Sequence, residues 1–210
     1  MDRLSKLRGS QSLQRRAGHK LPRSITLIVC EGETEQEYFE MARIWYGLTT
    51  AEVFLPSNNE GAAPISVVAC AEKKCAEQGG YDHVFCVFDR DGHESFERAR
   101  DKVHALSSRA HQPLPVKAII SIPCFEFWVL LHFEKTDAPF RRCDDVIQRV
   151  CIHQPGYVKA DATGARQLMQ RVDAAMGNAD WVEQRAATNN YNPYTNVHHV
   201  LRHFSDVTMK

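Results

Sequence analysis

Short apolar runs alternate with longer stretches of mixed polarity through the first two thirds of the chain. Each run is too short for a helix and is apolar on both faces, which predicts a buried strand of a parallel sheet. The stretches between the runs repeat apolar residues at helical spacing and predict helices. Thr34 and Glu37 fit a capping box at the start of the first helix. Strands are expected at 25–30, 51–56, 83–88 and 116–122, and helices at 34–46, 64–78 and 95–108.

This alternation predicts the fold class. A βαβαβαβ order gives an α/β fold with a doubly wound, mainly parallel sheet, right-handed crossovers and helices on both faces. An apolar helix is expected at 125–133, and beyond Pro139 the strand signal disappears in favour of helices at 143–151, 165–176 and 195–204. We therefore expect an α/β domain over 24–138 and a helical extension over 139–210 that packs on the same domain.

The composition is that of an ordinary globular protein. The chain has 210 residues, of which 43% are hydrophobic and 25% charged, enough for one main domain with a buried core. No apolar run is long enough to cross a bilayer or to serve as a signal peptide, which predicts a cytoplasmic protein without membrane association. The seven cysteines show no C-x-x-C spacing. Buried free thiols are therefore expected, rather than a zinc ribbon or disulfides.

The net charge of +0 conceals an uneven distribution. Residues 1–23 contain seven Lys or Arg and a single acidic residue, so the rest of the chain is acidic. A basic arm can hold a polyanion, because Lys and Arg neutralise phosphates with release of counterions. A flexible, solvated tail is the alternative.

Acidic side chains follow two of the predicted strands. Glu31 comes directly after the first strand, and Asp89 and Asp91 come directly after the third. With strand order 2-1-3-4 the order reverses between these two strands, and ligands of open parallel sheets bind there. Crowded carboxylates repel one another unless a cation neutralises them, and an all-oxygen set favours a hard ion. The sequence therefore predicts a Mg²⁺ site, in which Mn²⁺ can substitute; helix caps and turns are the structural alternative.

Four ordered motifs resemble the RloB-like family over about 24–204. They are EGETE at 31–35, FDRD at 88–91, SIPCFEFW at 121–128 and NPYTNVH at 192–198. That family is Toprim-related, lies near restriction-modification and other phage-defence genes, and is similar to defence nucleases that cut transfer RNA. Its members commonly have Ser-Asn-Pro where this chain has Ser-Ile-Pro at 121–123, and Asn-Pro-Ser-Thr where it has Asn-Pro-Tyr-Thr at 192–195. These departures leave the carboxylates unchanged.

The resemblance implies a Toprim-like site in which Glu31 is the Toprim glutamate and Asp89 and Asp91 form the metal-binding pair. The implied activity is Mg²⁺-dependent cleavage of phosphodiester bonds in RNA, transfer RNA among them, or in DNA, as an effector of anti-phage defence. A partner ATPase that acts as a sensor is implied as well, and a homodimer is left open. Glu31 is either a metal ligand or the general acid or base of this reaction.

Two further carboxylates are candidates for the catalytic site. Glu35, one helical turn beyond Glu31, either assists there or only favours the helix dipole. Glu126 lies in an apolar segment, where an ionised carboxylate requires a metal or a basic partner. We interpret Glu126 as a further ligand or acid, with an ion pair to an Arg at the edge of the core as the alternative.

Four basic residues are candidate contacts to nucleic acid. Arg90 lies between the two aspartates and His93 follows them, and both have plain exposure to solvent as the alternative. His198 and Arg202 lie on the last predicted helix. The histidines of this helix lack an H-E-x-x-H pattern, so no zinc site is expected there.

Two other classes of function compete with the nuclease. The first is a noncatalytic module that binds Mg²⁺ and a nucleotide or nucleic acid and works with a partner ATPase. Turnover distinguishes it from an enzyme. The second is a receiver-like phosphoryl-transfer domain, which the absence of a Lys-Pro pair after the last predicted strand disfavours.

Overall fold

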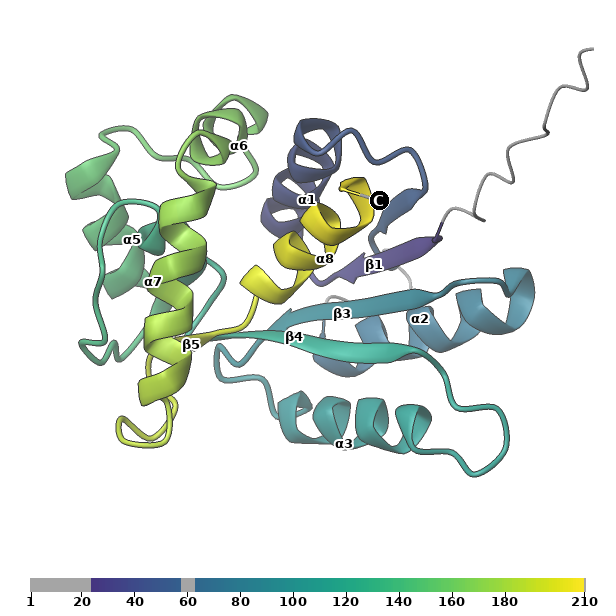
Figure 1. The fold of residues 1–210 in the computed structure, drawn as a ribbon. Helices are drawn as coiled ribbons and strands as arrows, with labels where there is room; N and C mark the ends of the chain where they lie inside the picture. Colours follow the sequence, from purple (N-terminus) through teal and green to yellow (C-terminus); the bar gives the residue numbers. More distant parts are fainter. Residues whose placement is uncertain (1–23, 58–62, 210) are drawn as a thin grey trace, which may run out of the picture.

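A five-stranded sheet forms the centre of the computed structural model, which describes residues 24–57 and 63–209. Its strand order is β2-β1-β3-β4-β5 (Figure 1). The first four strands run parallel, and the last is antiparallel to β4. The strands are β1 (Thr26–Cys30), β2 (Ala51–Phe54), β3 (His83–Asp89), β4 (Val116–Ile122) and β5 (Tyr194–Thr195).

Helices cover both faces of this sheet. α2 and α3 lie on one face, while α1 and α8 lie on the other, and α5, α6 and α7 stand beside the sheet (Figure 1). Successive residues of β1 point to opposite faces, so Ile28 belongs to one core cluster and Val29 to the other. The predicted α/β fold with a doubly wound, mainly parallel sheet is confirmed. The helices are α1 (Glu33–Trp45), α2 (Pro64–Gln78), α3 (Phe96–Ser107), α4 (Glu126–Leu131), α5 (Cys143–His153), α6 (Ala162–Met169), α7 (Val172–Arg185) and α8 (His198–Thr208).

The helical second half shares the core of the sheet. α4 is buried at every position and packs against α5 and α7. One core cluster runs from Ile28 in β1 through Trp128 in α4 to Val182 in α7. The segments 24–138 and 139–209 are therefore joined by continuous apolar packing.

Three expectations about local structure were wrong. The strand β5 was missed, because two residues are too few for a periodic pattern. The helix expected at 165–176 is two helices that extend to Arg185, since Ala175, Ala179 and Val182 continue the buried face past Gly177. α1 begins at Glu33 after Gly32, and no side chain caps it, so the capping box is absent.

Two further expectations concern membranes and the arm. Across 24–57 and 63–209, no helix combines the length and apolar character that a membrane span requires. The basic arm at 1–23 lies outside the described residues.

Candidate functional site

Glu31 and Asp89 meet at the carboxyl ends of the two central strands. β1 and β3 are neighbours in the sheet, with Cys30 opposite Val87. The Oε2 atom of Glu31 accepts a hydrogen bond from the backbone N–H of Asp89 at 3.0 Å. The Oδ2 atom of Asp89 accepts one from the backbone N–H of Phe125 at 2.8 Å. These two carboxylates thus connect β1, β3 and the turn that leads from β4 into α4.

The loop after β3 carries Arg90, Asp91 and His93 on the surface. The backbone N–H of Arg90 donates to Ser121 O at 3.1 Å, and that of Asp91 donates to Pro123 O at 3.0 Å. All three side chains are exposed. His93 Nε2 lies 3.3 Å from Glu31 Oε1, without the geometry of a hydrogen bond. The loop therefore places one exposed carboxylate and two basic groups beside the strand ends.

Two more carboxylates lie deeper, and together with Glu31 and Asp89 they form what we call the carboxylate cluster. Glu35 is 6% exposed and Glu126 is 1% exposed. Glu35 folds back over Gly32, where an added Cβ would lie 2.9 Å from Glu35 Oε2. A larger residue at this position would displace the Glu35 carboxylate from its present place. The expectation that Glu35 only favours the helix dipole does not fit a side chain that points inward.

Burial raises the pKa of three cluster carboxylates, Glu31, Glu35 and Asp89. It raises the pKa of Glu35 to about 7, and the charges of Glu126 and Glu31 add to the shift. The pKa of Asp89 is raised well above its usual range, first by burial and then by Glu35. Burial also raises the pKa of Glu31, although the backbone hydrogen bond from Asp89 opposes the shift. In the absence of a cation, the cluster holds protons that isolated carboxylates would have lost.

The cluster retains capacity to bind a cation. Glu31 Oε1 and Asp89 Oδ1 are buried and have no hydrogen-bond partner. Buried carboxylate oxygens without partners are costly unless a proton or a metal satisfies them. The donor atoms are all oxygens, which suits Mg²⁺. The donor atoms of Glu31 and Asp89 therefore fit the ion that the sequence predicts.

Lys159 is a member of this region that the sequence did not indicate. Its Nζ atom lies 2.8 Å from Glu126 Oε1, and its side chain is 53% exposed. It reaches Glu126 from the loop between α5 and α6, so no sequence pattern connects the two positions. The expected basic partner of Glu126 is thus a lysine rather than an arginine.

A disulfide lies against the same carboxylate. Cys124 and Cys143 are bonded, and they join the turn before α4 to the start of α5. Cys143 Sγ is 3.1 Å from Glu126 Oε2. The expectation of free thiols was wrong for this pair, because a separation of 19 residues follows no recognisable motif. The other five cysteines form no disulfide.

His198 and Arg202 face α7 instead of the carboxylate cluster. His198 Nε2 lies 3.2 Å from Glu183 Oε2, and Arg202 pairs with Asp180. His199 Nε2 approaches the same Glu183 oxygen at 3.0 Å. The candidate site residues therefore divide into two groups on different elements.

Compact sets of ligand atoms occur at two places in the described parts of the chain. In each set, the atoms offered by three side chains lie within 4.8 Å of one another. Glu31, Asp89 and Asp91 do not form such a set, since Asp91 stays at the surface. The sets are Cys124–Glu126–Cys143 and Glu183–His198–His199.

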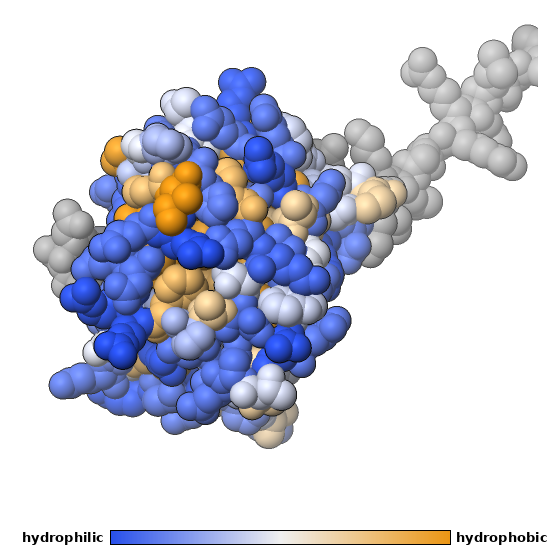
Figure 2. All heavy atoms as spheres, turned by 90° about the vertical axis from the view of Figure 1, so that its left-hand side faces the viewer, coloured by the Kyte–Doolittle hydropathy of each residue, from blue (hydrophilic) through white to orange (hydrophobic). Residues whose placement is uncertain are grey.

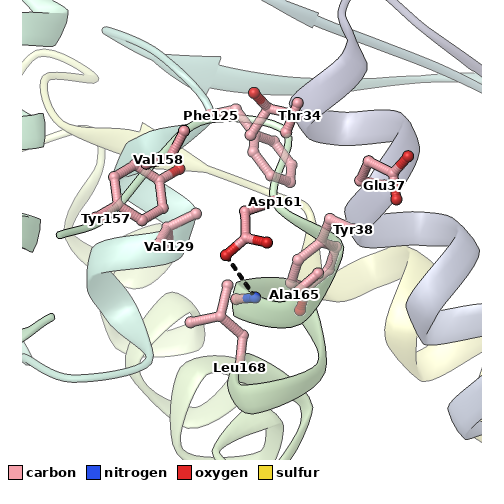
Figure 3. A pocket seen from close by; sticks show the side chains of 12 residues that line it. Thr34, Glu37, Tyr38, Phe125, Val129, Tyr157, Val158, Asp161, Ala165 and Leu168 are labelled. Atoms are coloured by element: carbon pink, nitrogen blue, oxygen red, sulfur yellow. Dashed lines mark hydrogen bonds between the residues drawn. The ribbon is translucent and has the colours of Figure 1, made fainter.

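A pocket lies beside the carboxylate cluster, between α1, α4 and the segment that leads into α6 (Figure 3). Tyr38, Phe125 and Tyr157 line it, and Asp161 caps α6 there by accepting from the N–H of Gly164 at 3.0 Å. Its volume of about 20 Å³ holds a single water molecule rather than a nucleotide. This pocket is therefore too small for a substrate, whereas Arg90 and His93 are exposed beside the strand ends.

Comparison with known protein families and structures complements this geometry. The family model described as "RloB-like protein" matches residues 26–204. Comparison with curated proteins found no match, and neither did comparison with solved structures. The match covers the sheet, the carboxylate cluster and the helices from α1 into α8, and the chain therefore belongs to the RloB-like protein family.

Proposed function

We propose that this protein is a Mg²⁺-dependent nuclease of Toprim type that cleaves phosphodiester bonds, with RNA, transfer RNA among them, as its expected substrate. The proposal depends on one observation: Glu31 and Asp89 meet at adjacent parallel strand ends, and each has a buried oxygen without a hydrogen-bond partner. Membership of the RloB-like family supports it. The resemblance of that family to defence nucleases extends the proposal to a role as an effector in anti-phage defence.

Glu31 and Asp89 would hold the ion, with Asp91 on the adjoining loop. When bound, Mg²⁺ supplies the positive charge that polarises a phosphodiester and stabilises the charge developing on its oxygens. In the metal-free protein burial raises the pKa of Glu35 to about 7, and this carboxyl group is the candidate to hold or release a proton beside the ion. Arg90 is exposed next to Asp89 and can pair with a neighbouring phosphate. Lys159 keeps Glu126 paired at the back of the cluster.

The proposed activity is tested with the purified full chain. Transfer RNA, other RNA and DNA are each incubated with Mg²⁺, with Mn²⁺ and with chelator. We expect fragments from RNA that require the metal and that disappear in Asp89→Asn. Asp144→Asn is the matched control, because Asp144 is an exposed carboxylate on α5. Cleavage that persists in chelator or in Asp89→Asn would contradict the proposed site.

A noncatalytic module that binds Mg²⁺ and nucleic acid, and that works with a partner ATPase, is the second candidate. The observation in its favour is that Glu31, Asp89 and Asp91 do not converge into one compact ligand set. This candidate predicts a rise in melting temperature with Mg²⁺ and nucleic acid, but no product. Product formation by the wild type, lost in Asp89→Asn, would exclude it.

A further inference from the structure

Two histidines and two carboxylates converge where α8 begins against α7. His198 Nε2 lies 3.2 Å from Glu183 Oε2 and 3.3 Å from Asp180 Oδ1. His199 Nε2 lies 3.0 Å from the same Glu183 oxygen. The ligand atoms of Glu183, His198 and His199 all lie within 4.8 Å of one another. Two consecutive residues of one helix thus direct their rings at a single carboxylate oxygen.

Both rings are within hydrogen-bond distance of Glu183 Oε2, but these bonds do not account for every contact of the group. The His198 side chain has no exposed surface, so its ring contacts only protein groups. A neutral imidazole has one N–H to donate, yet two carboxylate oxygens lie near Nε2. Arg202 compensates Asp180. Among the described residues, no Lys or Arg forms an ion pair with Glu183.

We propose that Glu183, His198 and His199 bind one transition-metal ion of the Zn²⁺ type, with Asp180 in reach as a fourth ligand. Imidazole nitrogen and carboxylate oxygen are the donors that Zn²⁺ takes in mixed sites. A histidine must be neutral to bind a metal through its ring nitrogen. Burial, followed by the nearby His199, lowers the pKa of His198 to about 4, which agrees with that requirement.

The second oxygen of the Glu183 carboxylate accepts a hydrogen bond that orients the group. Tyr194 Oη donates to Glu183 Oε1 at 3.0 Å, which leaves Oε2 directed at the two rings. Outer partners of this kind orient metal ligands and contribute to affinity. Tyr194 belongs to β5, which pairs with β4 at Ser121 and Ile122. Ser121 in turn lies opposite Asp89 in β3. A metal bound here would link α7 to α8, and Tyr194 would connect this pair to β5 and so to β4. Its role would be structural and distinct from catalysis.

The test uses the full chain, treated with EDTA and then titrated with Zn²⁺ in a calorimeter. All proteins carry Asp89→Asn and Asp91→Asn, so that Zn²⁺ bound at the carboxylate cluster does not contribute. We expect one equivalent of Zn²⁺ to bind. His199→Ala and Glu183→Gln should abolish binding, and Tyr194→Phe should weaken it roughly 10- to 100-fold. His111→Ala is the matched control, because His111 is exposed in a loop and its loss should leave the affinity unchanged.

His199 is 42% exposed, so its replacement should leave the fold intact, and circular dichroism checks this directly. Cobalt substitution adds a second measurement, since Co²⁺ in this site should give visible absorption bands that His199→Ala removes. The proposal is overturned if the parent protein binds no Zn²⁺. It is equally overturned if folded His199→Ala and Glu183→Gln bind Zn²⁺ as tightly as the parent.

Discussion

Glu35 provides the sharpest test of the carboxylate cluster, because its burial makes the stability of the protein depend on pH. Glu35→Gln keeps the size of the side chain and removes its charge. Glu33→Gln is the matched control, since Glu33 lies in the same helical turn and is exposed. Both variants are compared with the wild type in EDTA, so that no divalent cation neutralises the cluster.

The magnitude follows from the pKa of Glu35, which burial raises from 4.5 to about 7. The pKa of this carboxyl group is higher in the folded protein than in the unfolded chain. Its contribution to stability is therefore complete below the unfolded pKa of about 4.5 and is lost as the pH rises through the folded pKa of about 7. Each pKa unit corresponds to about 1.4 kcal/mol, so the whole shift amounts to about 3 kcal/mol. Glu35→Gln should therefore unfold with a free energy up to about 3 kcal/mol higher than the wild type at pH 8. The gain should shrink below about 1 kcal/mol at pH 5.

Urea unfolding followed by circular dichroism at pH 5 and pH 8 measures both differences. The wild type should lose stability between these values, and Glu35→Gln should lose less. Glu33→Gln should follow the wild type. The reasoning is refuted if Glu35→Gln gains nothing at pH 8, or if the exposed control shows the same dependence on pH.

Four further perturbations test other parts of the structure. Asp89→Asn with Asp91→Asn should abolish Mg²⁺ binding in calorimetry while the fold is kept, and unchanged affinity would remove the basis for the site. Glu31→Gln should lower cleavage by about 10² to 10⁴; an equal loss of metal affinity is expected for the proposed ligand, whereas unchanged metal affinity would make Glu31 the general acid or base instead. Cys143→Ser should lower the free energy of unfolding by about 3 kcal/mol under oxidising conditions, whereas no loss would show that the disulfide does not form. Deletion of residues 2–20 should flatten the salt dependence of nucleic-acid binding, and an unchanged slope would exclude the arm from that interface.

The sheet could be predicted from the sequence because its signals are local. Each buried strand is a continuous apolar run, and the runs alternate with amphipathic helices, so the parallel order followed from known handedness rules. The placement of Glu31 and Asp89 followed from the same rules, since both come directly after central strands. The structure joins them by a hydrogen bond. Their proximity therefore rests on topology rather than on any pattern within the motifs themselves.

Contacts between distant segments could not be predicted in this way. Lys159 reaches Glu126 across 33 positions from a loop, and nothing in its local sequence indicates that direction. Tyr194 and Thr195 form a strand only because their backbone pairs with the edge of β4. Glu35 follows the pattern of a first-turn acidic residue, yet Gly32 leaves room for its side chain to fold inward. Each of these features is decided by tertiary packing.

Burial and mutual repulsion of the carboxylates in the cluster lower the stability of the metal-free protein. Neighbouring groups offset part of this cost. Backbone N–H groups of Asp89 and Phe125 each donate to a cluster carboxylate, and Lys159 pairs with Glu126. These contacts leave Glu31 Oε1 and Asp89 Oδ1 without hydrogen-bond partners. A purely structural arrangement would gain stability by replacing these acids with amides, since amides accept the same hydrogen bonds without repulsion. Local arrangements that oppose stability in this way are characteristic of functional sites, and this favours a cation-binding role over a capping role for Glu31 and Asp89.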